Sequence, residues 1–98
     1  MHAGAQAVVE RSANGPQPDD PIAALIAKGE HREALSRCAK VHGPILGRLC
    51  IALVGSQADA DEAVQETLLA AHRAMPGYRG EGTVKAWLCG IARRRLSS

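Results

Sequence analysis

The sequence predicts an all-α protein, a compact bundle of three to four helices that follows a disordered N-terminal leader. Apolar residues recur every three or four positions from residue 21 onward, which is the spacing of a helix face. Helix start and stop signals divide this stretch into segments, and no segment alternates apolar and polar residues as a strand does. A chain of 98 residues is long enough for one small domain with a single core.

The N-terminal stretch differs in composition from the rest of the chain. Residues 1–20 mix Ala, Gly, Pro and polar residues without a period, and we expect a disordered leader there. Asp20 followed by Pro21 predicts a helix start, because aspartate caps helices and proline suits the first helical position. The predicted domain therefore spans residues 21–96, and its first helix is short and stops at Gly29.

A long second helix is expected from Glu30 to Val54, ended by Gly55. Its predicted apolar face consists of Leu35, Cys38, Val41, Ile45, Leu49 and Leu53. Gly43 and Pro44 interrupt this helix, and proline removes one backbone donor and clashes with the preceding turn. We therefore expect a helix that is kinked, or split, at this point.

Two more helices complete the predicted bundle. The third begins after Ser56 and Gln57 and ends at Pro76 and Gly77. Its predicted buried residues are Ala60, Ala63, Val64, Thr67, Leu68 and Ala71. The glycine-rich loop "GYRGEG" follows, and Thr83 can cap a fourth helix. The buried residues predicted for that helix are Val84, Trp87, Leu88 and Ile91.

Composition limits the classes of function. The net charge is only +2, so affinity for nucleic acid would have to come from local patches. The three cysteines form no C-x-x-C pair and lie in apolar patterns, which favours reduced, buried thiols in a cytoplasmic protein. We find no apolar run of the ~18–20 residues that a transmembrane helix needs and no signal peptide, so no membrane association is expected.

Charged residues of opposite sign lie on either side of the glycine-rich loop. The third helix carries Asp61, Glu62, Gln65 and Glu66 on its polar side, and the fourth carries Lys85, Arg93, Arg94 and Arg95. The acidic face could simply meet water, the more frequent case, or dock a basic or amide-rich helix. The basic residues could complement the helix dipole or contact phosphates. Tyr78, Arg79 and the loop glycines would lie beside that basic surface and could hold an unstacked base.

Metal binding and catalysis find little support. His31, Cys38 and His42 share one side of the long helix, but His31 and His42 are about 16 Å apart along its axis. Only Cys38 and His42 could cooperate, so we expect buried packing, no metal site and no cofactor, and a metal- or redox-responsive domain stays an alternative. The sequence has no nucleophile–base pattern, no P-loop and no HExxH motif, so an enzyme is not expected.

The segment "DADEAVQETLLAAHRAMPGYRGEGTVKAWLCGIARR" closely resembles region 2 of the extracytoplasmic-function (ECF) group of bacterial sigma factors. The likeness rests on V-Q-E-T, R-G-E-G and W-L-x-x-I-A-R at the spacing of that family, and it extends over about Ile22 to Arg95. It departs at Leu68, where the family usually has Phe, and at His72, where it often has Trp. Thr83 and Val84 likewise replace the more common Ser and Phe. Members of this group continue into a second helical domain that reads the −35 element, so we expect the chain to be a fragment.

The resemblance implies partners for the two charged surfaces. It implies that the third helix binds the clamp helices of the RNA polymerase β′ subunit, through Asp61, Glu62, Gln65 and Glu66. It also implies that the loop and the fourth helix recognise and help to melt the promoter −10 element, capturing a base of the non-template single strand. The residues implicated in binding DNA are Tyr78, Arg79, Gly80, Glu81, Gly82, Lys85, Arg93 and Arg94.

A regulator and an alternative function follow from the same resemblance. An anti-sigma factor is a further expected partner. The competing hypothesis is an interaction module that keeps the fold but binds no DNA, acting as an adaptor or decoy for polymerase or for an anti-sigma factor. That module would show no preference among DNA strands.

Overall fold

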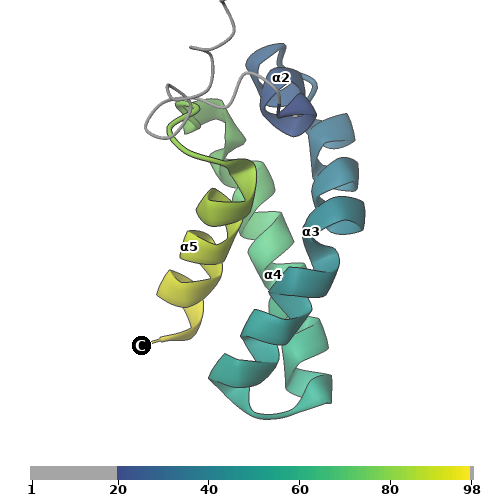
Figure 1. The fold of residues 1–98 in the computed structure, drawn as a ribbon, viewed down its shortest axis with the longest axis vertical. Coiled ribbons are helices and arrows are strands. Elements are labelled where there is room, and N and C mark those ends of the chain that lie inside the picture. The colour runs from purple at the N-terminus through teal and green to yellow at the C-terminus, as the bar shows by residue number, and fades with distance from the viewer. Residues whose placement is uncertain (1–19, 98) are drawn as a thin grey trace, which may run out of the picture.

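The computed structural model describes residues 20–97, which form four α-helices and one short 3₁₀ helix (Figure 1). These elements are α2 (Pro21–Ala27), α3 (His31–Val54), α4 (Gln57–Ala74), η1 (Met75–Gly77) and α5 (Val84–Leu96). No strand occurs among the described residues, and the all-α prediction is confirmed. The leader predicted for residues 1–20 lies outside the described residues except for Asp20.

Local signals in the sequence account for the helix ends. The Asp20 carboxylate caps α2, and the Ser56 hydroxyl accepts a hydrogen bond from the Asp59 amide at 3.2 Å to cap α4. The Thr83 hydroxyl caps α5 by accepting from the Ala86 amide at 3.0 Å. At Gly55, the end of α3, the backbone has φ +87°, a left-handed conformation that glycine adopts without strain.

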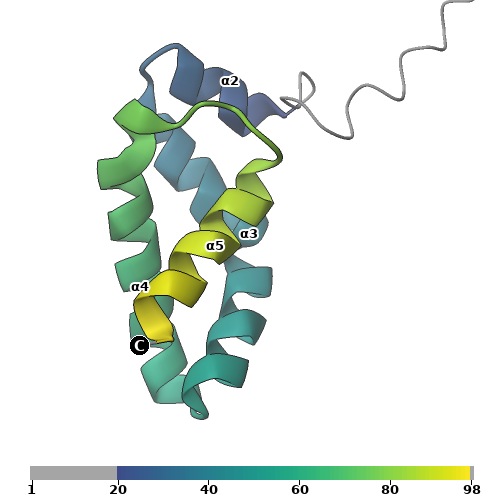
Figure 2. The ribbon, with the colours of Figure 1, turned by 90° about the vertical axis from the view of Figure 1, so that its left-hand side faces the viewer.

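The helices α3 and α4 form an antiparallel hairpin, and α5 packs against both of them (Figures 1 and 2). The short α2 packs on α3 at the end of the bundle opposite the α3–α4 turn. Small residues dominate the buried side of α4: Ala60, Ala63, Thr67 and Ala71. Small side chains let the helix backbones approach closely, and Leu46 and Leu88 then fill the space between them.

The structure corrects the apolar face predicted for α3. Val41 is 60% exposed and Leu53 is 38% exposed, although both were predicted to be buried. The fully buried residues are instead Ala34, Cys38, Leu46 and Cys50, which lie four or eight positions apart. The physical reason is that α2, α4 and α5 together cover only part of the surface of α3, and only residues that face these helices are enclosed. The helix is continuous through Gly43 and Pro44, so the split alternative is wrong.

Predictions for the other helices agree better with the structure. The predicted positions on α4 and α5 are buried, except that Val64, Leu68 and Trp87 are half-buried. All three thiols are free, Cys38 and Cys50 are buried, and Cys89 is half-buried. Burial raises the pKa of Cys38 to about 11, with a smaller contribution from the Asp20 carboxylate. This thiol therefore stays protonated at neutral pH, which suits a packing role.

Candidate functional site

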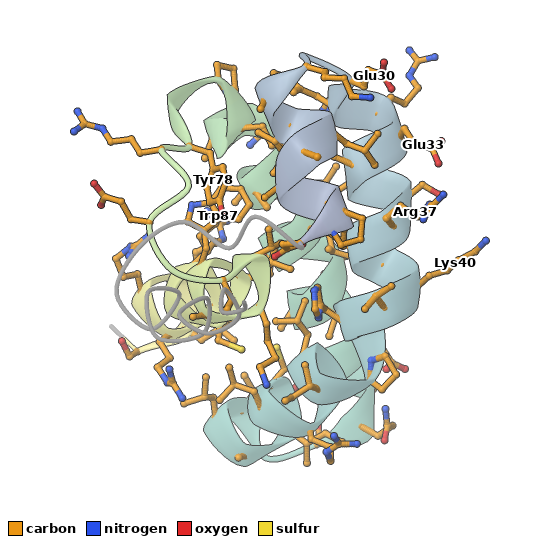
Figure 3. All side chains as sticks on the ribbon, turned by 45° about the horizontal axis from the view of Figure 1, so that its top comes forward. Glu30, Glu33, Arg37, Lys40, Tyr78 and Trp87 are labelled. Atoms are coloured by element: carbon orange, nitrogen blue, oxygen red, sulfur yellow. The ribbon has the colours of Figure 1, made fainter. Side chains whose placement is uncertain are left out.

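The loop between η1 and α5 is built around one aromatic pair. The ring centroids of Tyr78 and Trp87 are 4.8 Å apart with planes inclined at 58°, and Figure 3 shows the two side chains together beneath the loop. Gly80 and Gly82 have φ of +76° and +80°, which lets the loop turn sharply over this pair. The Tyr78 hydroxyl is buried and has no hydrogen-bond partner among the described residues. Burial raises the pKa of Tyr78, and the Asp20 carboxylate adds to that effect.

A hollow of about 200 Å³ opens at this loop and is lined by Gly77, Tyr78, Arg79, Glu81 and Trp87. It offers a guanidinium that only donates hydrogen bonds and a carboxylate that accepts them. Both groups are on exposed residues, whereas the two aromatic residues are half-buried and form the apolar part of the lining. Such a combination can hold a planar group by stacking while hydrogen bonds read its edge.

Asp20 joins the loop region to the opposite end of the sequence. One of its carboxylate oxygens accepts from the Ile22 and Ala23 amides at 3.1 and 3.4 Å and so caps α2. The other oxygen accepts from the Val84 amide, the first residue of α5, at 3.2 Å. A single side chain therefore caps the N-termini of two helices, and its bond to Val84 spans 64 positions of the chain.

A second hollow, of about 360 Å³, lies where α2, α3 and α5 meet. Its lining residues are Asp20, Pro21, Ile22, Arg37, Val41, His42, Thr83 and Lys85. Burial lowers the pKa of His42, and the opposing charges of Asp20 and Lys85 are smaller influences. Arg37 already pairs with Glu33 at 3.2 Å on the outer side of α3 (Figure 3). The other cation that lines this hollow, Lys85, lies close to the loop in the sequence.

The outer face of α4 carries the acidic residues as predicted. Asp61, Glu62, Gln65 and Glu66 are all exposed, and the Gln57 amide donates to Asp61 at 2.8 Å. Leu69 is 53% exposed and follows Gln65 and Glu66 by one helical turn, so an apolar side chain lies within the acidic face. An acidic face with an exposed leucine suits a basic partner that also offers apolar side chains.

The basic residues of α5 do not form one cluster. Lys85 lies in the first turn beside the loop, while Arg93 and Arg94 lie in the last turn, about 12 Å further along the axis. Arg95 approaches Glu66 of α4, with 3.9 Å between nitrogen and oxygen, and both side chains are exposed. The acidic and basic surfaces therefore meet at the C-terminal end of α5, and only Lys85 adjoins the loop.

Comparison with known families agrees with this geometry. The family described as Sigma-70 region 2 matches residues 38–98, which include α4, the loop and α5. The chain belongs to the Sigma-70 region 2 family. Two curated relatives, both named ECF RNA polymerase sigma factor SigG, come from two strains of Mycobacterium tuberculosis. Each is 44% identical over 43 residues, a segment that covers 44% of this chain and 12% of the relative. No solved structure matches the chain.

In this region 2 domain, α4 brings the four predicted polymerase contacts to one face, and the loop brings Tyr78, Arg79 and Glu81 to one hollow. Gly80 and Gly82 shape the loop, while Arg93 and Arg94 lie apart from it. Sequence reasoning missed two residues. Leu69 follows the acidic residues in the sequence, and its exposure could have been read from the helical period. Asp20 was predicted as a cap of α2, but its bond to Val84 has no signal in the sequence.

Two further observations concern metals and membranes. Within residues 20–97, no three His, Cys, Asp or Glu side chains gather closely enough to share a metal ion. None of the helices formed by those residues has the length and apolar character needed to cross a bilayer.

Proposed function

We propose that this region 2 domain is the promoter-recognition module of an ECF sigma factor, acting in the cytoplasm without catalytic chemistry of its own. In this proposal α4 binds the clamp helices of the RNA polymerase β′ subunit, and the loop captures a base of the non-template −10 strand so that transcription can start. Membership of the Sigma-70 region 2 family and the likeness to an ECF RNA polymerase sigma factor support a role in transcription initiation. The matched segment is 12% of those relatives, so the proposal concerns this module alone.

The loop hollow is the observation that carries the DNA half of the proposal. A base that leaves the double helix loses a few kcal/mol of stacking and pairing, which a protein pocket has to offset. The hollow offers the edge of an aromatic pair, the Arg79 guanidinium and the Glu81 carboxylate. Lys85 on the adjoining turn of α5 would hold a neighbouring phosphate, and Arg93 and Arg94 would contact the backbone further along the helix.

The outer face of α4 supports the polymerase half. Its acidic residues Asp61, Glu62 and Glu66 are exposed, and Gln65 adds a side-chain amide among them. A basic coiled coil would meet complementary charge there, which favours rapid and correctly oriented association. Leu69 would supply the apolar contact at the centre of such an interface. An anti-sigma factor that covered this face would prevent polymerase binding.

The test of DNA capture compares substitutions of two arginines, one that lines the loop hollow and one outside it. Arg79→Ala removes a residue that lines the hollow, and Arg73→Ala removes an exposed cation at the end of α4. Fluorescence anisotropy would be measured with labelled single-stranded DNA that varies at one central base. We expect Arg79→Ala to abolish the preference among bases, and Arg73→Ala to keep it. Equal, unselective binding by the wild type and both variants would contradict capture of a base by this loop.

The test of polymerase binding uses charge reversal at two exposed glutamates. Glu62→Lys places a cation within the α4 face, whereas Glu30→Lys makes the same charge change at the start of α3. Retention by immobilised RNA polymerase core should fall by about tenfold for Glu62→Lys, because a like charge across an interface costs more than 1 kcal/mol. The proposal for α4 fails if Glu30→Lys weakens retention equally.

One observation favours the alternative of a module that binds only proteins. The Tyr78 ring already packs against Trp87, and its hydroxyl is buried, so little free aromatic surface remains for a base. An adaptor or decoy would bind polymerase or an anti-sigma factor and would show no preference among DNA strands. Base preference in the anisotropy experiment separates the two functions.

A further inference from the structure

The structure assigns Asp20 a positioning role for the DNA-binding loop. Its second carboxylate oxygen accepts from the Val84 amide at 3.2 Å and so fixes the point at which the loop ends and α5 begins. We infer that this bond sets the orientation of the loop hollow and of Lys85 toward DNA. The inference rests on the proposed function, because it concerns the same loop.

The start of α5 is held from two sides. Thr83 caps the helix locally through the Ala86 amide at 3.0 Å, and its carbonyl accepts from the Trp87 amide at 3.1 Å. The Val84 amide has no partner within its own helix, because the first amides of a helix always lack one. Asp20 supplies that partner from outside, and the Val84 side chain is completely buried at this point. The first turn of α5 is therefore attached to α2 rather than only to the loop.

The α5 flank of the hollow depends on this attachment. Trp87 and Lys85 lie in the first turn of α5, so a shift of Val84 moves Trp87 relative to Tyr78 and moves Lys85 with it. At the other end of the loop, the Tyr78 amide donates to the Met75 carbonyl at 3.0 Å and holds that flank to η1. Gly80 and Gly82 hold the left-handed φ values that turn the loop between these anchors, and the two ends set where that turn lies on the bundle.

Substitution by asparagine separates the two bonds of Asp20. An asparagine side chain has a single accepting oxygen, and its other terminal atom is a nitrogen that donates. Asp20→Asn can cap α2 or accept from Val84, but cannot do both as the carboxylate does. Asn is also among the best capping residues, so the domain should stay folded. Ser56→Ala is the matched control, since it removes one cap from α4, far from the loop hollow.

The experiment combines DNA binding with amide hydrogen exchange on the full 98-residue chain. Labelled single-stranded DNA that varies at one central base is titrated with the wild type, Asp20→Asn, Ser56→Ala and Arg79→Ala. We expect Asp20→Asn to reduce the preference among bases about fivefold or more, because misplaced hydrogen bonds to a base edge lose about 1 kcal/mol or more of discrimination. Ser56→Ala should bind as the wild type does. Exchange of the Val84 amide should accelerate in Asp20→Asn beyond any change in the core amides.

Each outcome decides a separate point. If Asp20→Asn and Ser56→Ala both bind like the wild type while Arg79→Ala loses its preference, Asp20 has no positioning role and the proposed function stands. If the wild type itself shows no preference, the proposed function fails. Should Asp20→Asn unfold, Asp20→Ser replaces it, because serine also caps α2 but is too short to reach both helices. The inference would also be overturned if Asp20→Asn lost its preference among bases while the exchange rate of the Val84 amide stayed unchanged.

Discussion

Replacing glycine by alanine should have opposite effects inside α3 and at its C-terminal end. Gly47 lies inside the helix, and a Cβ atom added there would meet nothing within 4 Å apart from its chain neighbours and the backbone of its own helix. Glycine in a helix interior costs about 0.5–1 kcal/mol relative to alanine, because it loses more backbone entropy on folding. The substitution Gly47→Ala should therefore stabilise the domain by about 0.5–1 kcal/mol.

Gly55 provides the control of opposite sign. Space is equally open around it, but its φ is +87°, in the left-handed region. For an L-residue with a Cβ atom, that conformation is less favourable by about 1–2 kcal/mol. Gly55→Ala should therefore destabilise the domain by about that amount, although it adds the same methyl group.

Urea unfolding followed by circular dichroism measures both effects as changes in the midpoint at constant slope. In thermal unfolding, each kcal/mol should shift the melting temperature of a domain of this size by about 4–8 °C. A loss of stability in Gly47→Ala as large as that in Gly55→Ala would refute this prediction. That result would mean that the backbone around Gly47 is not helical and that α3 is interrupted after all.

Three further predictions concern single side chains. The pKa of Cys38 is raised to about 11, so the folded state keeps a proton that the unfolded state loses above about pH 9. Stability should thus fall by up to about 2–3 kcal/mol between about pH 9 and pH 11, and urea unfolding of Cys38→Ala should show a shallower pH dependence. Tyr78→Phe removes a buried hydroxyl that has no hydrogen-bond partner among the described residues. The free energy of unfolding should therefore stay the same or rise by up to about 1 kcal/mol. A marked fall in urea unfolding would show that the hydroxyl is hydrogen-bonded. Arg95→Ala should change the free energy of unfolding by less than about 1 kcal/mol, because the Arg95–Glu66 ion pair is 3.9 Å long and exposed. A larger loss in urea unfolding would show that this ion pair stabilises the domain.

The helices and their ends could be predicted because the signals act within a few residues. Asp20 and Thr83 cap the helices that follow them and Gly55 ends α3, as the sequence indicates, while the cap by Ser56 starts α4 at Gln57, one residue earlier than expected. The acidic face of α4 could also be predicted, since the 3.6-residue period alone separates Glu62 and its neighbours from the buried alanines.

The details of packing could not be predicted in the same way. Val41 continues the apolar period of α3 but is exposed, because it lines the open hollow between α2, α3 and α5 and not a close contact between helices. The period says which residues share a face, and only the neighbouring helices determine how much of that face is enclosed. The loop hollow likewise depends on the approach of Tyr78 to Trp87, which the spacing of nine positions does not reveal.

The sequence by itself determined the all-α fold, the order of the helices and the two surfaces of opposite charge, because these follow from local spacing and composition. The tertiary structure decided which residues of α3 are buried, where the acidic and basic surfaces meet, and how Asp20 joins α2 to α5. The physical reason is that a bond across 64 positions depends on how whole helices pack, and the free energy of that packing is shared among many residues.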